Sequence, residues 1–177
     1  MKKPDIRAVA SFGVAALKID KEIIMTLEWD FIKPLESENL IDEFEQLRRY
    51  KFPVSFRECV IKNNAGYPSK DVFDTAATEE RCISYLLSFN KRGDATIWDS
   101  VEAYESNINV AKQYGDLDEA NALKYIFNRY VVFADTPFGD DIAFDKTDDS
   151  VVYIDHETLE VEKIADSFDE FLNCLYD

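Results

Sequence analysis

The only histidine of the chain, His156, lies between Asp155 and Glu157 in a predicted turn. An imidazole beside carboxylates could act as a general base. However, no motif places a serine or cysteine nucleophile near it, and the chain contains no G-x-S-x-G, H-E-x-x-H, G-x-x-x-x-G-K or G-x-G-x-x-G pattern. We therefore predict that His156 is a surface turn residue and that the protein is not an enzyme.

A second group that could do chemistry is a run of aspartates in the C-terminal part of the chain: Asp135, Asp140, Asp141, Asp145, Asp148 and Asp149. Such a density suggests calcium, but the glycine and terminal glutamate of an EF-hand loop are misplaced. The sequence leaves a glycosidase-like carboxylate pair open, although neighbouring acids in a strand would point to opposite faces. Solvated turn acids are the favoured interpretation, so we predict neither a metal site nor a cofactor.

The three cysteines, Cys59, Cys82 and Cys174, form an odd set without a C-x-x-C pair. Their apolar neighbours predict core thiols rather than nucleophiles. Neither a disulfide framework nor a cysteine zinc site is expected, and a reducing compartment such as the cytoplasm fits best.

Composition predicts a single folded domain with an uneven charge. The 177 residues are 46% hydrophobic and include 13 Phe, which is ample material for a core. The net charge is −16; residues 1–70 carry 12 basic and 11 acidic side chains, whereas residues 71–177 carry 8 and 25. This acidic half repels nucleic acid and anionic membranes and attracts basic partners, although solubility alone is a simpler explanation.

The N-terminal stretch, residues 1–28, is treated as an extension of the domain at 29–177. Its basic start and the mildly apolar run from Ala8 to Leu17 faintly resemble a signal peptide, but the run is short and is followed by Lys18 and Asp20. We expect an extra strand or helix packed on the domain. The sequence leaves open whether Met25 rather than Met1 is the natural start.

The elements that must position these residues follow from periodicity and capping signals. A central hairpin over 130–144 joins two apolar runs through the Pro137–Gly139 turn, and Gly66 is a predicted left-handed helix cap. The other expected helices are 38–50 capped by Ser37, 53–62, a helix to 113 capped by Asp99 or Ser100, a short helix 116–125, and a last helix capped by Ser167. The other expected strands are an edge strand 67–75, a long strand 81–90, and strands 151–154 and 159–162. This order predicts an α+β fold with a mainly antiparallel sheet.

Several motifs occur together in one order along the chain. They are Phe52-Pro53 through Asn64-Ala65-Gly66, Leu87-Ser88-Phe89-Asn90, Phe133-Ala134-Asp135 with Phe138-Gly139-Asp140, Tyr153 to Glu157, and the closing run from Ile164 to Leu172. Over residues 29–175 the set resembles the SUKH superfamily, and within it the cell-wall-regulator-like (Smi/Knr) family. Residues 1–28 lie outside the pattern, and the segment from Lys112 to Asn128 looks longer than the family's usual connection.

The resemblance implies a single domain with helices packed on a bent antiparallel sheet. It also implies an immunity protein of a polymorphic or contact-dependent toxin system, which binds a cognate toxin domain, often a nuclease, inside the producing cell. No catalytic residue carries over from the family. A general protein-interaction or regulatory scaffold of the cell-wall-regulator type remains the alternative.

From charge and predicted loops, we expect a basic toxin domain to contact exposed acids and aromatics near the sheet. The candidate partner-binding residues are Tyr67, Asp74, Glu79, Glu80, Asp140, Asp141, Asp148 and Asp149. Neither nucleic acid nor membrane is an expected partner. The sequence leaves the toxin, the binding face and the oligomeric state open.

Overall fold

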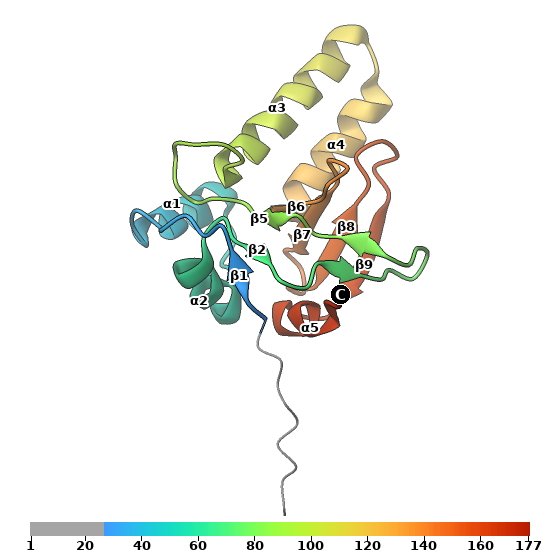
Figure 1. Ribbon diagram of the computed structural model, residues 1–177. Coiled ribbons are helices and arrows are strands. Elements are labelled where there is room, and N and C mark those ends of the chain that lie inside the picture. Colours follow the sequence, from blue (N-terminus) through green and yellow to red (C-terminus); the bar gives the residue numbers. More distant parts are fainter. Residues whose placement is uncertain (1–26) are drawn as a thin grey trace, which may run out of the picture.

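The computed structural model describes residues 27–177 (Figure 1). The predicted N-terminal extension therefore lies outside the described residues, apart from Leu27 and Glu28. The helices are α1 (Asn39–Arg48), α2 (Val54–Asn63), α3 (Ile97–Tyr114), α4 (Leu117–Arg129) and α5 (Phe168–Cys174). The strands are β1 (Trp29–Asp30), β2 (Tyr67–Pro68), β3 (Val72–Phe73), β4 (Arg81–Cys82), β5 (Tyr85–Leu86), β6 (Tyr130–Asp135), β7 (Asp141–Asp145), β8 (Val151–Ile154) and β9 (Val161–Ala165).

The main sheet has the order β5-β6-β7-β8-β9, and every neighbouring pair is antiparallel. The predicted hairpin is confirmed as β6 and β7, with Val131 opposite Phe144 and Val132 opposite Ala143. A bulge follows Val132, which adds twist to the sheet. Two further two-stranded sheets, β1-β2 and β3-β4, complete the described strands. The predicted α+β fold with a mainly antiparallel sheet is confirmed.

Helices cover both faces of the main sheet, which explains why all of β6 up to Ala134 is buried. On one face, Phe56 of α2 and Phe168 of α5 lie with their ring centres 5.1 Å apart, and Phe133 stacks on Phe144 beneath them. On the other face, α3 and α4 pack around β6 and then project beyond the sheet as an antiparallel helical hairpin (Figure 1). The tip of this hairpin is therefore the least embedded part of the helical layer.

The long strand predicted over 81–90 is wrong. The chain forms β4, which pairs with β3, and then leaves that small sheet to form β5 beside β6. Likewise, the edge strand predicted over 67–75 divides into β2 and β3. The reason is that a run of apolar residues marks burial but does not reveal which neighbour each short piece pairs with. The strand expected over 159–162 begins later, as β9, because Leu159 adopts a turn conformation with φ of 59°.

Several predicted caps are corrected. Ala65, with φ of 59°, takes the left-handed position expected for Gly66. Gly66 is required for a different reason, because a Cβ there would lie 2.8 Å from the carbonyl oxygen of Asn63. Thr96 caps α3 through a capping box with Asp99, three residues before the expected start. Helix α4 runs to Arg129, well beyond the short helix predicted.

The predicted start of α5 is confirmed, but the predicted cap of α1 is not. Glu38 occupies the N-cap position of α1, and Ser37 lies one residue before it. Leu47, three residues after the buried Phe44 on α1, is nevertheless exposed. The predicted Ser167 cap of α5 is confirmed, since its side chain accepts a hydrogen bond from the Glu170 backbone N–H.

Candidate partner-binding surface

The structure places the predicted partner-binding residues in separate regions. Tyr67 of β2 is 40% exposed and lies in edge-to-face contact with Phe31. Three exposed acids, Asp74, Glu79 and Glu80, lie on the loop between β3 and β4. Two more, Asp148 and Asp149, are exposed on the turn between β7 and β8. The six exposed residues therefore come from three different elements of the fold.

Asp140 and Asp141 were predicted to be exposed, but Asp140 is buried and Asp141 is partly buried. The side chain of Asp140 is buried, and it accepts hydrogen bonds from the Tyr153 hydroxyl and from the His156 backbone N–H at 3.0 Å. Asp141 points away from it and accepts a hydrogen bond from the Tyr104 hydroxyl at 2.7 Å. Because alternate residues of a strand face opposite sides, the two acids serve two different layers of the fold. Both carboxylates already accept hydrogen bonds from donors inside the fold.

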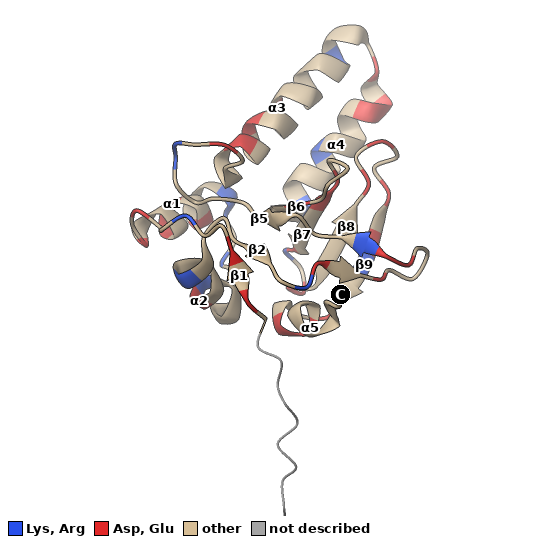
Figure 2. Cartoon of the chain, viewed as in Figure 1, with Lys and Arg blue, Asp and Glu red and all other residues tan. Residues whose placement is uncertain are grey.

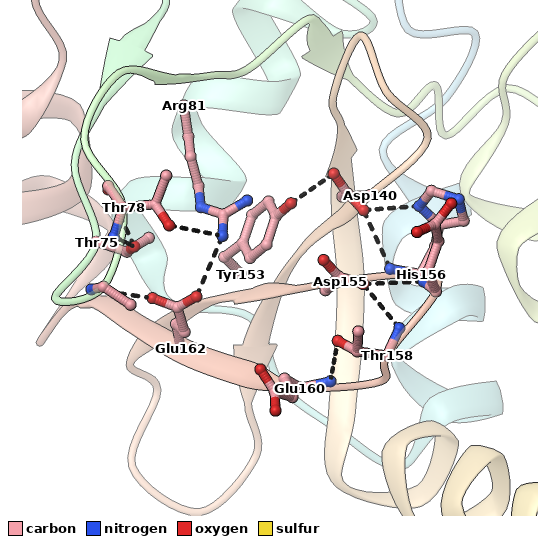
Figure 3. A network of polar contacts seen from close by, with 12 residues as sticks. Thr75, Thr78, Arg81, Asp140, Tyr153, Asp155, His156, Thr158, Glu160 and Glu162 are labelled. Atoms are coloured by element: carbon pink, nitrogen blue, oxygen red, sulfur yellow. Dashed lines mark hydrogen bonds and ion pairs between the residues drawn. The ribbon is translucent and has the colours of Figure 1, made fainter.

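A polar network ties Asp140 to the loop between β3 and β4 (Figure 3). The Arg81 guanidinium stacks 3.7 Å from the Tyr153 ring centre and forms an ion pair with Glu162 at 3.2 Å. Glu162 also accepts a hydrogen bond from the Ala77 backbone N–H. The network therefore holds the acidic β3–β4 loop against β8 and β9, which limits its freedom to reorganise.

The buried and half-buried acids titrate in opposite directions. Burial opposes ionisation of Asp140, but hydrogen bonds from Tyr153 and His156 outweigh it and hold the Asp140 pKa below its usual value. Burial raises the pKa of Asp141 to about 6, and the charges of Asp135 and Asp140 add to that rise. Asp141 therefore carries a proton more readily than an ordinary surface carboxyl.

His156 lies in the turn between β8 and β9 with its side chain 50% exposed, as predicted from the sequence. Its Nδ1 lies 2.7 Å from an Asp140 oxygen, and this hydrogen bond raises the pKa of the imidazole. In the described part of the chain, the ring forms no hydrogen bond to a serine, threonine or cysteine. The geometry gives His156 a structural role in fixing the turn.

The cysteines and acidic residues of the described chain do not form a metal-binding cluster. Cys59 and Cys82 are partly buried, but Cys174 is exposed, which corrects its assignment as a core thiol. Cys174 follows the last buried residues of the short helix α5, so its side chain lies beyond the packed face. Within residues 27–177, no group of three or more His, Cys, Asp or Glu side chains could hold a metal ion.

Three basic residues, Arg48, Arg49 and Lys146, line one cavity together with Glu105. Arg48 is buried and donates to the carbonyl oxygens of Phe127 and Tyr130, where α4 ends. Lys146 donates to the Arg48 carbonyl oxygen, where α1 ends, and burial lowers its pKa to about 8. Arg48 and Lys146 thus bond carbonyl oxygens at two helix C-termini, so the fold itself accounts for these two cations.

Sequence reasoning missed a groove between the tip of the α3–α4 hairpin and the β8–β9 turn. It has a volume of about 860 Å³. Its lining includes acidic residues from both elements, and Figure 2 shows acidic residues at the start of α4 and on the β8–β9 turn. The sequence signal that could have indicated it is an aromatic residue, Tyr114, close to the acidic residues that begin α4. Only the fold brings the β8–β9 turn beside them.

The described chain is thus one α+β domain with an antiparallel sheet and acidic loops. Residues 36–174 match the SMI1/KNR4 family (SUKH-1). Because this match covers well over half of the chain, the protein belongs to that family, as the resemblance in its motifs predicted. No curated protein matches the chain. Among the described helices, none is long and apolar enough to cross a membrane.

Proposed function

We propose that this protein is a non-enzymatic immunity protein, which binds a cognate bacterial toxin domain and blocks it in the cytoplasm of the producing cell. Membership of the SMI1/KNR4 family carries this proposal. The charge distribution supports it, because residues 71–177 carry 25 acidic and only 8 basic side chains. A toxin that acts on nucleic acid needs a basic groove, so an acidic inhibitor complements it.

The fold suits inhibition by occlusion. The aromatic core and the Arg81–Tyr153–Asp140 network hold the acidic loops on a stiff sheet. A rigid surface loses little conformational entropy when it binds, so more of the interaction energy appears as affinity. The acidic field also speeds association with a basic partner, which matters when the toxin must be captured before it acts.

The test is a pull-down of the tagged protein from its own cell extract, performed at low and at high salt and analysed by mass spectrometry. We expect recovery of one basic toxin-like domain, with less recovery at high salt because exposed charge pairs are screened. The recovered domain should then be toxic when expressed alone and harmless when co-expressed with this protein.

Two outcomes contradict the proposal. Capture of several unrelated regulatory proteins without a toxin favours the interaction-scaffold alternative. A recovered domain that remains toxic on co-expression, although both proteins are soluble and bound to each other, excludes immunity. Salt-resistant capture of a neutralised toxin keeps the function but assigns the energy to apolar contacts.

A further inference from the structure

The groove at the hairpin tip, hereafter the tip groove, is built from two elements that are distant in the sequence. Val110 and Tyr114 of α3 and Leu123 of α4 form its apolar part, and His156 and Glu157 of the β8–β9 turn form the opposite wall. In Figure 1 the β8–β9 turn lies beside α4. The groove therefore exists only in the assembled fold, and none of the partner-binding residues predicted from the sequence lines it.

Three carboxylates in the tip groove have no partner within the described chain. The side chains of Asp118, Glu119 and Glu157 accept no hydrogen bond and form no ion pair with any residue of 27–177. No lysine or arginine lines the groove, and the His156 ring is already held by Asp140. The groove thus presents uncompensated negative charge.

Helix capping explains only part of this acidity. Asp116 accepts a hydrogen bond from the Glu119 backbone N–H at 3.0 Å, and acids in the first turn of α4 interact favourably with the helix dipole. Glu157, however, comes from a different element and has no helix to stabilise. The same side of the molecule thus receives acids from α4 and from the turn.

The apolar part of the groove is the second observation. Its floor contains the buried residues Ala111 and Leu123, whereas Tyr114 is 83% and Val110 46% exposed. An exposed tyrosine over an apolar floor, with a charged rim, has the layout of a protein-interaction site. Tyrosine is also among the residues that most often dominate binding energy.

We propose that the tip groove is the docking site for a segment of the partner protein that carries lysine or arginine next to apolar side chains. This inference rests on the proposed binding function and names the face that performs it. The basic groups would pair with Asp118, Glu119 and Glu157, and the apolar groups would cover Tyr114 and the groove floor. A second copy of this chain is a poor occupant, because its net charge of −16 opposes self-association at an acidic groove.

The test uses the full chain and a display library of short random peptides as the probe. The groove variant combines Asp118→Asn, Glu119→Gln and Glu157→Gln, and Tyr114→Ala removes the exposed aromatic. A matched control combines Asp169→Asn, Glu38→Gln and Glu58→Gln, which changes the charge equally at exposed acids of other helices, including a first-turn acid of α5. A loop variant, Asp74→Asn with Glu79→Gln and Glu80→Gln, tests the surface predicted from the sequence.

We expect selection on the wild-type chain to enrich peptides with lysine or arginine beside apolar residues. The groove variant and Tyr114→Ala should each weaken binding of the enriched peptides by about tenfold, and the control and loop variants should leave it unchanged. Thermal melting of each variant verifies folding. No enrichment, enrichment of acidic peptides, or binding that survives the groove variant overturns the proposal.

The outcome is separable from that of the proposed function. If the groove variant still neutralises the toxin as well as the wild type does, immunity stands and the tip groove is excluded as its binding face. If no toxin exists but the peptides bind and lose affinity with the groove variant, the docking site stands and immunity fails.

Discussion

Two groups of acidic residues in this protein have the same chemistry and opposite surroundings. At the β6–β7 hairpin, Asp135, Asp140 and Asp141 each accept a hydrogen bond from a different tyrosine hydroxyl, those of Tyr85, Tyr153 and Tyr104. At the tip groove, the carboxylates of Asp118, Glu119 and Glu157 contact no donor within the described chain. The first group is part of the fold, whereas the second faces solvent.

The difference shows that acidity alone does not identify a binding surface. A carboxylate whose hydrogen bonds are satisfied internally is part of the packing of the fold, and exchanging those bonds for a partner's cation would gain little. A carboxylate without an internal partner costs the fold little and remains available for binding. The comparison can be tested by changing one group at a time.

Asp140→Ala should have the largest effect on stability. It leaves the buried Tyr153 hydroxyl and the His156 backbone N–H without an acceptor, and removes the charge paired with His156. We expect a loss of about 3 kcal/mol in the free energy of unfolding, measured by urea denaturation at neutral pH. Glu157→Ala is the matched change at an exposed acid, and an equal loss in the two variants would contradict the comparison.

Asp141→Asn should act in the opposite direction. The folded-state pKa of Asp141 is raised to about 6 from an ordinary value near 3.8, so its contribution to stability is present at low pH and lost as the pH rises through 6. Asparagine retains an acceptor for Tyr104 and removes the charge opposite Asp135. We expect a gain of about 1 kcal/mol at pH 7–8 and almost none at pH 4. A gain that does not change with pH would contradict this cause.

His156→Ala tests the same network through its pH dependence. The pKa of His156 is raised in the fold, so its contribution is present below its unfolded pKa and lost as the pH rises through the folded one. The pKa of Asp140 is lowered, so its contribution is present above its unfolded pKa and lost as the pH falls. The melting temperatures of wild type and variant should therefore differ most between about pH 4 and 6.5 and converge in alkali. If the difference in melting temperature does not change with pH, the effect of the substitution comes from packing and not from the Asp140–His156 charge pair.

The smallest effect on stability is expected for the groove variant, Asp118→Asn with Glu119→Gln and Glu157→Gln. Losing two first-turn acids weakens α4, while reducing a net charge of −16 relieves self-repulsion. We expect a net change of about 0.5 kcal/mol by urea denaturation. A large loss in the free energy of unfolding would mean that these acids stabilise the fold, as Asp140 does, and would contradict the comparison.

Local patterns predicted much of the fold. The hairpin formed by β6 and β7 followed from its β-branched runs and its Pro–Gly turn, and the start of α5 followed from Ser167. The division of 81–90 between two sheets could not be predicted, because strand pairing depends on segments far along the chain. For the same reason, the burial of Asp140 depends on Tyr153 and His156 and left no local signal.

The sequence by itself determined the α+β class, the family and the excess of acid in residues 71–177, because these depend on composition and on patterns within short segments. Only the tertiary structure decided which acids are available. Asp140 lost its exposure to a hydrogen-bonded network, whereas Glu157 and Asp118 were brought together from separate elements and left unpaired. The physical reason is that solvation of a charge is set by its neighbours in space, which the order of residues does not state.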